Sequence, residues 1–103
     1  MASGTLGSSN PAATTNTVVY TVPTGKIASF NVNIANTSGV TMSVRLAIAT
    51  NGTPTLNEYL EYDLVIPGNS SFERSGILAS AGKNIVAYVS NANAAINIFG
   101  YEE

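Results

Sequence analysis

The sequence predicts an all-β protein, an antiparallel β-sandwich of the jelly-roll or immunoglobulin-like type with about seven or eight strands. Apolar residues alternate with small polar residues along several short segments, which is the two-residue period of half-buried strands. Pro, Gly, Asn and Ser cluster between those segments, and no segment has a convincing helical period. With 103 residues, of which 45% are hydrophobic, the chain is long enough for one folded domain.

The clearest strand lies within residues 26–36, where Phe30, Val32 and Ile34 share one side and small polar residues occupy the other. Residues 40–49 repeat this pattern after the turn-forming residues 36–39, so the two segments are predicted to form an antiparallel hairpin. Residues 91–93 carry a second hairpin signal. The segments expected as strands are 17–22, 26–36, 40–49, 58–66, 71–78, 84–90 and 94–101.

Residues 1–16 are predicted to form an extended N-terminal arm, separate from a sandwich domain of residues 17–103. Ser, Thr, Gly, Ala and Asn dominate this segment, and Leu6 is its only large apolar side chain after Met1. Such a segment has no core of its own, so it is either disordered or ordered against a partner. Leu6 is then the expected apolar anchor.

The composition argues against catalysis. The chain has no His, Cys or Trp, four basic and six acidic residues, and a net charge of −2. Without His or Cys, the common nucleophile–base pairs and thiolate zinc sites cannot be built, so we expect no catalytic residues, no cofactor and no metal. Four scattered cations do not make the basic footprint that nucleic acids or anionic membranes require, so neither is an expected partner.

Two other groups of residues are open to functional interpretations. Glu61 and Asp63 are two positions apart, so a strand would point both carboxylates to the same side, as in a glycosidase pair or a calcium site. No Trp or His is present to line a cleft, and we interpret the pair as part of a solvated face. The five tyrosines lie mostly within predicted strands, which favours core edges or subunit contacts over a sugar platform. Tyr59 is the tyrosine expected to be most exposed.

The order of several short motifs resembles a group of short structural proteins of tailed bacteriophages, including those that infect cyanobacteria. The resemblance covers nearly the whole chain. The residues that carry it are the Ser/Ala/Thr-rich N-terminal segment, Tyr20-Thr21-Val22-Pro23, Gly25-Lys26, Asn36, Arg45-Leu46-Ala47-Ile48-Ala49, Glu58-Tyr59-Leu60-Glu61-Tyr62-Asp63, Ile66-Pro67, Glu73-Arg74-Ser75-Gly76, Ala81-Gly82-Lys83 and Gly100-Tyr101-Glu102-Glu103.

This resemblance implies a small β-sandwich on the virion, made in the host cytoplasm and assembled on the phage particle. The implied function is that of a capsid decoration (cement) protein, which binds the phage major capsid protein and neighbouring copies of itself, with a homotrimer favoured. The alternative is a tail, neck or fibre component, including a receptor- or glycan-binding module that uses loop 50–57. The candidate partner-binding residues are Ala2, Thr5, Leu6, Pro11, Tyr59 and Tyr101.

Overall fold

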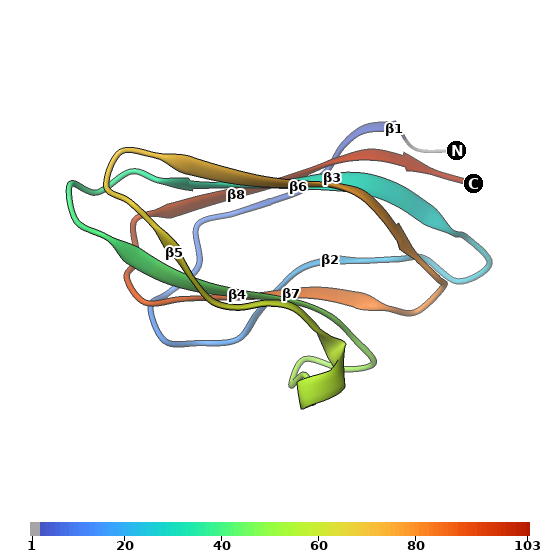
Figure 1. Ribbon diagram of the computed structural model, residues 1–103. Coiled ribbons are helices and arrows are strands. Elements are labelled where there is room, and N and C mark those ends of the chain that lie inside the picture. The colour runs from blue at the N-terminus through green and yellow to red at the C-terminus, as the bar shows by residue number, and fades with distance from the viewer. Residues whose placement is uncertain (1–2) are drawn as a thin grey trace.

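The computed structural model describes residues 3–103, which form eight strands in two four-stranded antiparallel sheets (Figure 1). Sheet A has the order β1-β8-β3-β6, and sheet B has the order β2-β7-β4-β5. The predicted all-β class and the antiparallel pairing are confirmed. The elements are β1 (Ser3–Ser9), β2 (Thr17–Thr21), β3 (Ala28–Asn36), β4 (Met42–Ala49), the 3₁₀ turn η1 (Leu56–Glu58), β5 (Tyr59–Ile66), β6 (Ser71–Ala79), β7 (Asn84–Val89) and β8 (Ala94–Glu102).

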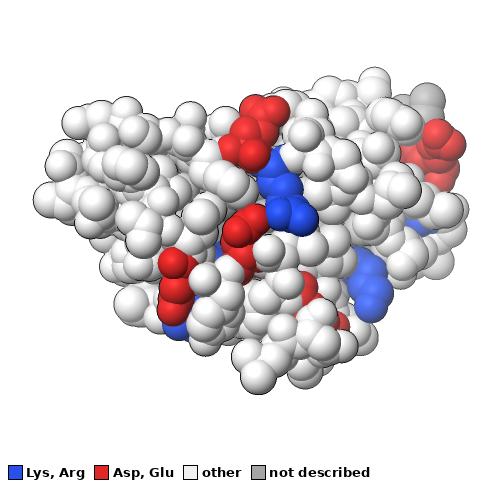
Figure 2. Space-filling view, viewed as in Figure 1, with Lys and Arg blue, Asp and Glu red and all other residues white. Residues whose placement is uncertain are grey.

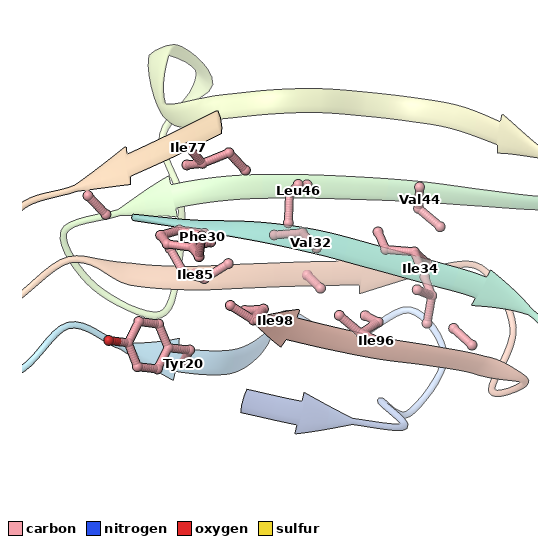
Figure 3. Packing of buried hydrophobic residues seen from close by; sticks show 14 of the residues in the cluster. Tyr20, Phe30, Val32, Ile34, Val44, Leu46, Ile77, Ile85, Ile96 and Ile98 are labelled. Carbon is pink, nitrogen blue, oxygen red and sulfur yellow. The ribbon is translucent and has the colours of Figure 1, made fainter. Parts of the chain in front are cut away.

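The hydrophobic core lies between the two sheets. Burial along β3 alternates at every residue, so Phe30, Val32 and Ile34 point inward while their neighbours point outward. These side chains meet Val44 and Leu46 of β4, in the opposite sheet (Figure 3). Each such aliphatic or aromatic side chain contributes about 1.5–3 kcal/mol when it is fully buried. The predicted alternation therefore produces one continuous core that joins the sheets.

The predicted hairpins on both sides of this core are wrong. β3 belongs to sheet A and β4 to sheet B, and likewise β7 and β8 lie in different sheets. Among the described strands, only β4 and β5 are consecutive in the chain and paired. The turn residues reverse the chain as expected, but the reversed strands stack across the core instead of pairing side by side.

Asn36 explains how the chain crosses between the sheets after β3. Its side chain is buried, with 2% exposure, and its Nδ2 donates to the carbonyl oxygens of Val40 at 2.7 Å and Ile66 at 3.1 Å. Its Oδ1 accepts a hydrogen bond from the Ser38 backbone N–H at 3.0 Å. A buried amide with these partners holds the loop 37–41 against the end of β5, which is in the other sheet.

The N-terminal segment is not the separate arm that the composition predicts. Within residues 3–16, β1 pairs with β8 as an edge strand of sheet A, and Leu6 packs against the shared core. Pro11 is buried, and the Asn10 side chain donates to the Ala92 carbonyl at 2.8 Å. The Thr14 N–H donates to the Val89 carbonyl at 2.8 Å. Main-chain pairing does not depend on large side chains, so a segment with little apolar surface still belongs to the domain.

Candidate interaction surfaces

The outer face of sheet A carries an apolar patch, which we define as Ile27, Leu78, Phe99 and Tyr101. Leu78 of β6 and Tyr101 of β8 both lie opposite Ser29 of β3, one on each side. The exposed fractions are 56% for Ile27, 69% for Leu78 and 43% for Tyr101, while Phe99 is half-buried. Solvent-exposed apolar side chains gathered at one end of a sheet are typical of contact surfaces.

The rest of this outer face is small and uncharged. One row across β1, β8 and β3 consists of Ser8, Asn97 and Asn33. Two residues further along β3, Ala35 lies opposite Ala95 of β8. Within the described residues, the outward-facing charged side chains of this sheet lie at its margins. One is Glu73, opposite Asn33 on the edge strand β6, and the other is Glu103, opposite Ile27. The centre of the face can therefore lose its water at little electrostatic cost.

The outer face of sheet B is partly covered by its own chain. Ala47, Ala49 and Val86 point outward but have at most 1% exposure, because Tyr59 packs against them. The loop that precedes Tyr59 is held by Glu58, whose carboxylate accepts hydrogen bonds from the Thr55 N–H at 2.9 Å and the Thr50 N–H at 3.1 Å. These bonds, chiefly the one from the Thr55 backbone, lower the pKa of Glu58.

The exposed tyrosine of this face is Tyr62 and not Tyr59. Tyr62 has 52% exposure, and the Arg45 guanidinium lies 4.2 Å from its ring centre and 4.6 Å from that of Tyr88. The edge of Tyr59 meets Tyr62 with 4.9 Å between the ring centres. Arg45 donates to Asp63 at 2.7 Å, and this hydrogen bond raises the pKa of the guanidinium. A bound sugar would stack on the face of the Tyr62 ring, but Arg45 already occupies a face of this ring. This contact weighs against a sugar platform at Tyr62.

Glu61 and Asp63 are not the paired carboxylates that strict alternation predicts. Asp63 has a φ of 54°, and the register of β5 against β4 shifts between Val44 and Leu46, so the strand carries a bulge. Glu61 instead forms an ion pair with Arg74 of β6, with 2.7 Å between the charged groups. This ion pair links the edge strands of the two sheets. In Figure 2, charges of opposite sign meet over the middle of the molecule, where β5 and β6 lie, and the left end has none.

A buried pair that the sequence analysis missed joins β2 to β8. The Tyr20 hydroxyl donates to the Glu102 carboxylate, and the two residues have 9% and 8% exposure. Burial, the hydrogen bond and the charge of Glu102 together raise the pKa of Tyr20. The sequence of β8 contains a signal for the burial of Glu102. Ile96 and Ile98 point inward, and continuing the same two-residue period along the strand makes Glu102 an inward position as well.

The predicted partner-binding residues that the structure describes lie on different parts of the surface or in the core. Thr5 and Tyr101 share the outer face of sheet A, where Thr5 lies opposite Phe99. Leu6 points toward the core, and Pro11 is buried. Tyr59 is half-buried on sheet B. Ala2 lies outside the described residues.

Residues 3–103 contain no detected pocket and no cluster of three or more acidic residues with metal-ligand spacing. No described helix is long and apolar enough to cross a membrane. Comparisons of the chain with protein-family models, with curated proteins and with solved structures found no match.

Proposed function

We propose that this chain is a non-enzymatic structural protein of a phage particle, a capsid decoration protein that binds the major capsid protein and neighbouring copies of itself. Three parts of this proposal come from the sequence resemblance: the assignment to a phage, the location on the virion and the expected homotrimer. The observation that carries the proposal is the outer face of sheet A, which is uncharged across its centre and bears exposed apolar side chains at one end. Such a face suits packing against other proteins.

We also propose that the fold is a jelly roll and not an immunoglobulin-like sandwich. The pairs β1–β8, β2–β7, β3–β6 and β4–β5 are those of one long antiparallel ribbon rolled into two sheets. An eight-stranded double sheet of this kind is typical of jelly rolls, which include viral capsid domains and lectins. Immunoglobulin constant-type sandwiches divide seven strands into sheets of four and three. The strand order therefore supports the jelly roll, and with it a building-block role.

The test uses capsids assembled from the major capsid protein of the phage that carries this chain. Purified protein is mixed with these capsids and separated on a density gradient. We expect saturable co-sedimentation, and we expect Asn33→Lys to weaken it because the substitution places a charge in the centre of the outer face. The control is Thr53→Lys, which adds the same charge to an exposed loop of the other sheet. Absence of co-sedimentation would contradict the proposal, and equal binding of the two variants would contradict the role of this face.

A second candidate function is a receptor- or glycan-binding module of a fibre or tail. One observation favours it: loop 50–58 stands out from sheet B and presents Leu56 with 83% exposure (Figure 1). Saturable binding of the purified protein to a glycan array or to host cells, lost in Leu56→Ser, would favour this candidate over decoration. Binding to capsids without binding to glycans or cells would remove it.

A further inference from the structure

In the apolar patch, a small side chain lies between two large ones; we call Leu78 the knob and the position of Ser29 the notch. Leu78 and Tyr101 flank Ser29 in one cross-strand row, with one strand spacing on each side. Adjacent strands lie about 4.8 Å apart, so these two large side chains are rooted roughly 10 Å from each other with a small hydroxyl between them. We propose that this patch is the contact with a second copy of the chain, in which Leu78 of one copy inserts beside Ser29 of the other.

The distribution of charge favours a second copy as the occupant. Two copies each carry a net charge of −2, so they meet at the lowest electrostatic cost through surfaces that bear no charged side chains. The centre of the outer face of sheet A is such a surface, whereas the face of sheet B bears Arg45 and Asp63, and the side of the sandwich bears Arg74 and Glu61. A strongly charged partner would find no complementary groups at the patch. A copy of the same face brings both the knob and the notch, so the contact is two-fold and is distinct from the three-fold contact of the homotrimer that the resemblance implies.

The area of the face is sufficient for a stable contact. β3 and β8 are nine residues long, which corresponds to about 30 Å, and four strands span about 19 Å. The resulting area of roughly 600 Å² is of the same order as the ~800 Å² that each partner buries in a typical stable interface. The apolar patch would form the dry part of the contact at one end of the face, and Glu103, opposite Ile27, would remain at the polar rim.

The test is the oligomeric state of the full chain, measured by sedimentation velocity over a range of concentrations. We expect an oligomer that dissociates on dilution. Leu78→Ser removes the knob and should weaken association at least about tenfold. Ser29→Phe fills the notch and should do the same. The control is Leu56→Ser, which removes an even more exposed leucine from η1 and should leave association unchanged. Circular dichroism confirms that each variant is folded.

A wild-type monomer at high micromolar concentration would overturn the inference, and so would a mass that neither Leu78→Ser nor Ser29→Phe changes. The inference rests on the proposed function, because it names the surface through which neighbouring copies meet. Capsid binding of the same variants separates the two claims. A wild-type monomer that still co-sediments with capsids removes the self-contact and leaves decoration standing. An oligomer that Leu78→Ser dissociates, but that never binds capsids, leaves the self-contact and removes decoration.

Discussion

Replacing Tyr20 with Phe tests the one buried polar link between the edge strand β2 and the C-terminal strand β8. The substitution removes a single hydroxyl, which donates to the Glu102 carboxylate. The phenyl ring can keep its edge contact with Phe30, whose ring centre lies 6.1 Å away. Among the described residues, every buried side-chain nitrogen or oxygen has a hydrogen-bond partner. Tyr20→Phe would leave the Glu102 carboxylate without the partner that it has here.

The expected loss of stability follows from the burial of the pair. Tyr20 and Glu102 have 9% and 8% exposure, so water cannot replace the hydroxyl without a rearrangement. A hydrogen bond to a charged group contributes about 1.5–3 kcal/mol to stability, and a buried acceptor that is left without a donor adds a desolvation penalty. We therefore expect Tyr20→Phe to lower the free energy of unfolding by about 2–3 kcal/mol. Glu102→Gln keeps an oxygen that can accept from Tyr20, so it should cost less than Tyr20→Phe.

Urea denaturation of the wild type, both single variants and the double variant gives the coupling energy between the two residues at neutral pH. We expect the double variant to be less destabilised than the sum of the two single variants. In the double variant, Tyr20→Phe has removed the hydroxyl, but Glu102→Gln has replaced the carboxylate by a neutral amide, so no buried charge is left without a partner. A loss below about 0.5 kcal/mol for Tyr20→Phe, together with no coupling, would refute the reasoning and would mean that water reaches Glu102.

The same pair predicts a pH dependence. The pKa of Tyr20 is raised in the folded protein, so the unfolded chain loses the phenolic proton first, near pH 10. The stability from this group is complete below pH 10 and is lost as the pH rises above it. Thermal melts of the wild type should shift downward above pH 10, more steeply than those of Tyr20→Phe. Parallel curves for the two proteins would contradict the assignment.

Three further predictions concern other parts of the fold. Gly7→Ala should cost about 1–3 kcal/mol and loosen β1, because the added Cβ would lie 2.7 Å from the Val19 carbonyl oxygen; hydrogen exchange of β1 amides should rise, unlike in the exposed control Ser8→Ala. The pKa of Glu58 is lowered, so its hydrogen bonds to the loop persist to below pH 4.5 and are lost as the pH falls further. The amide NMR signals of Thr50 and Thr55 should therefore shift in that acidic range, and they should not shift in Glu58→Gln. Ile98→Ala should cost about 2–5 kcal/mol, since Ile98 has 0% exposure in the core, and a much smaller loss in a denaturant titration would mean that the core collapses around the site.

The period-two pattern was sufficient for the class and for the positions of β2 to β8, but not for β1, whose sequence has little apolar surface. The alternation around Phe30 and Ile34 requires a buried and an exposed side, and only a strand with that spacing provides them. It does not say which strand lies next to which. The pairing of β3 with β6 and β8 depends on backbone hydrogen bonds between distant segments, and these leave no mark in the side-chain pattern. The hairpin prediction failed for this reason.

The candidate surfaces were harder to predict for a similar reason. Tyr101 was named from the sequence, and it lies in the apolar patch, but Leu78 and Ile27 come from other segments and meet it only through sheet register. On β5, the positive φ of Asp63 breaks the alternation, so Tyr62 becomes exposed where Tyr59 was expected. A single-residue bulge changes the side to which the flanking side chains point.

The pairing of the first strand with the last also affects how the molecule forms. β8 lies between β1 and β3, so β1 has no partner in sheet A until β8 has been synthesised. During synthesis, the strands made before β8 keep their apolar rows exposed until β8 is available to pair with them. Deleting β8 should therefore prevent sheet A from assembling.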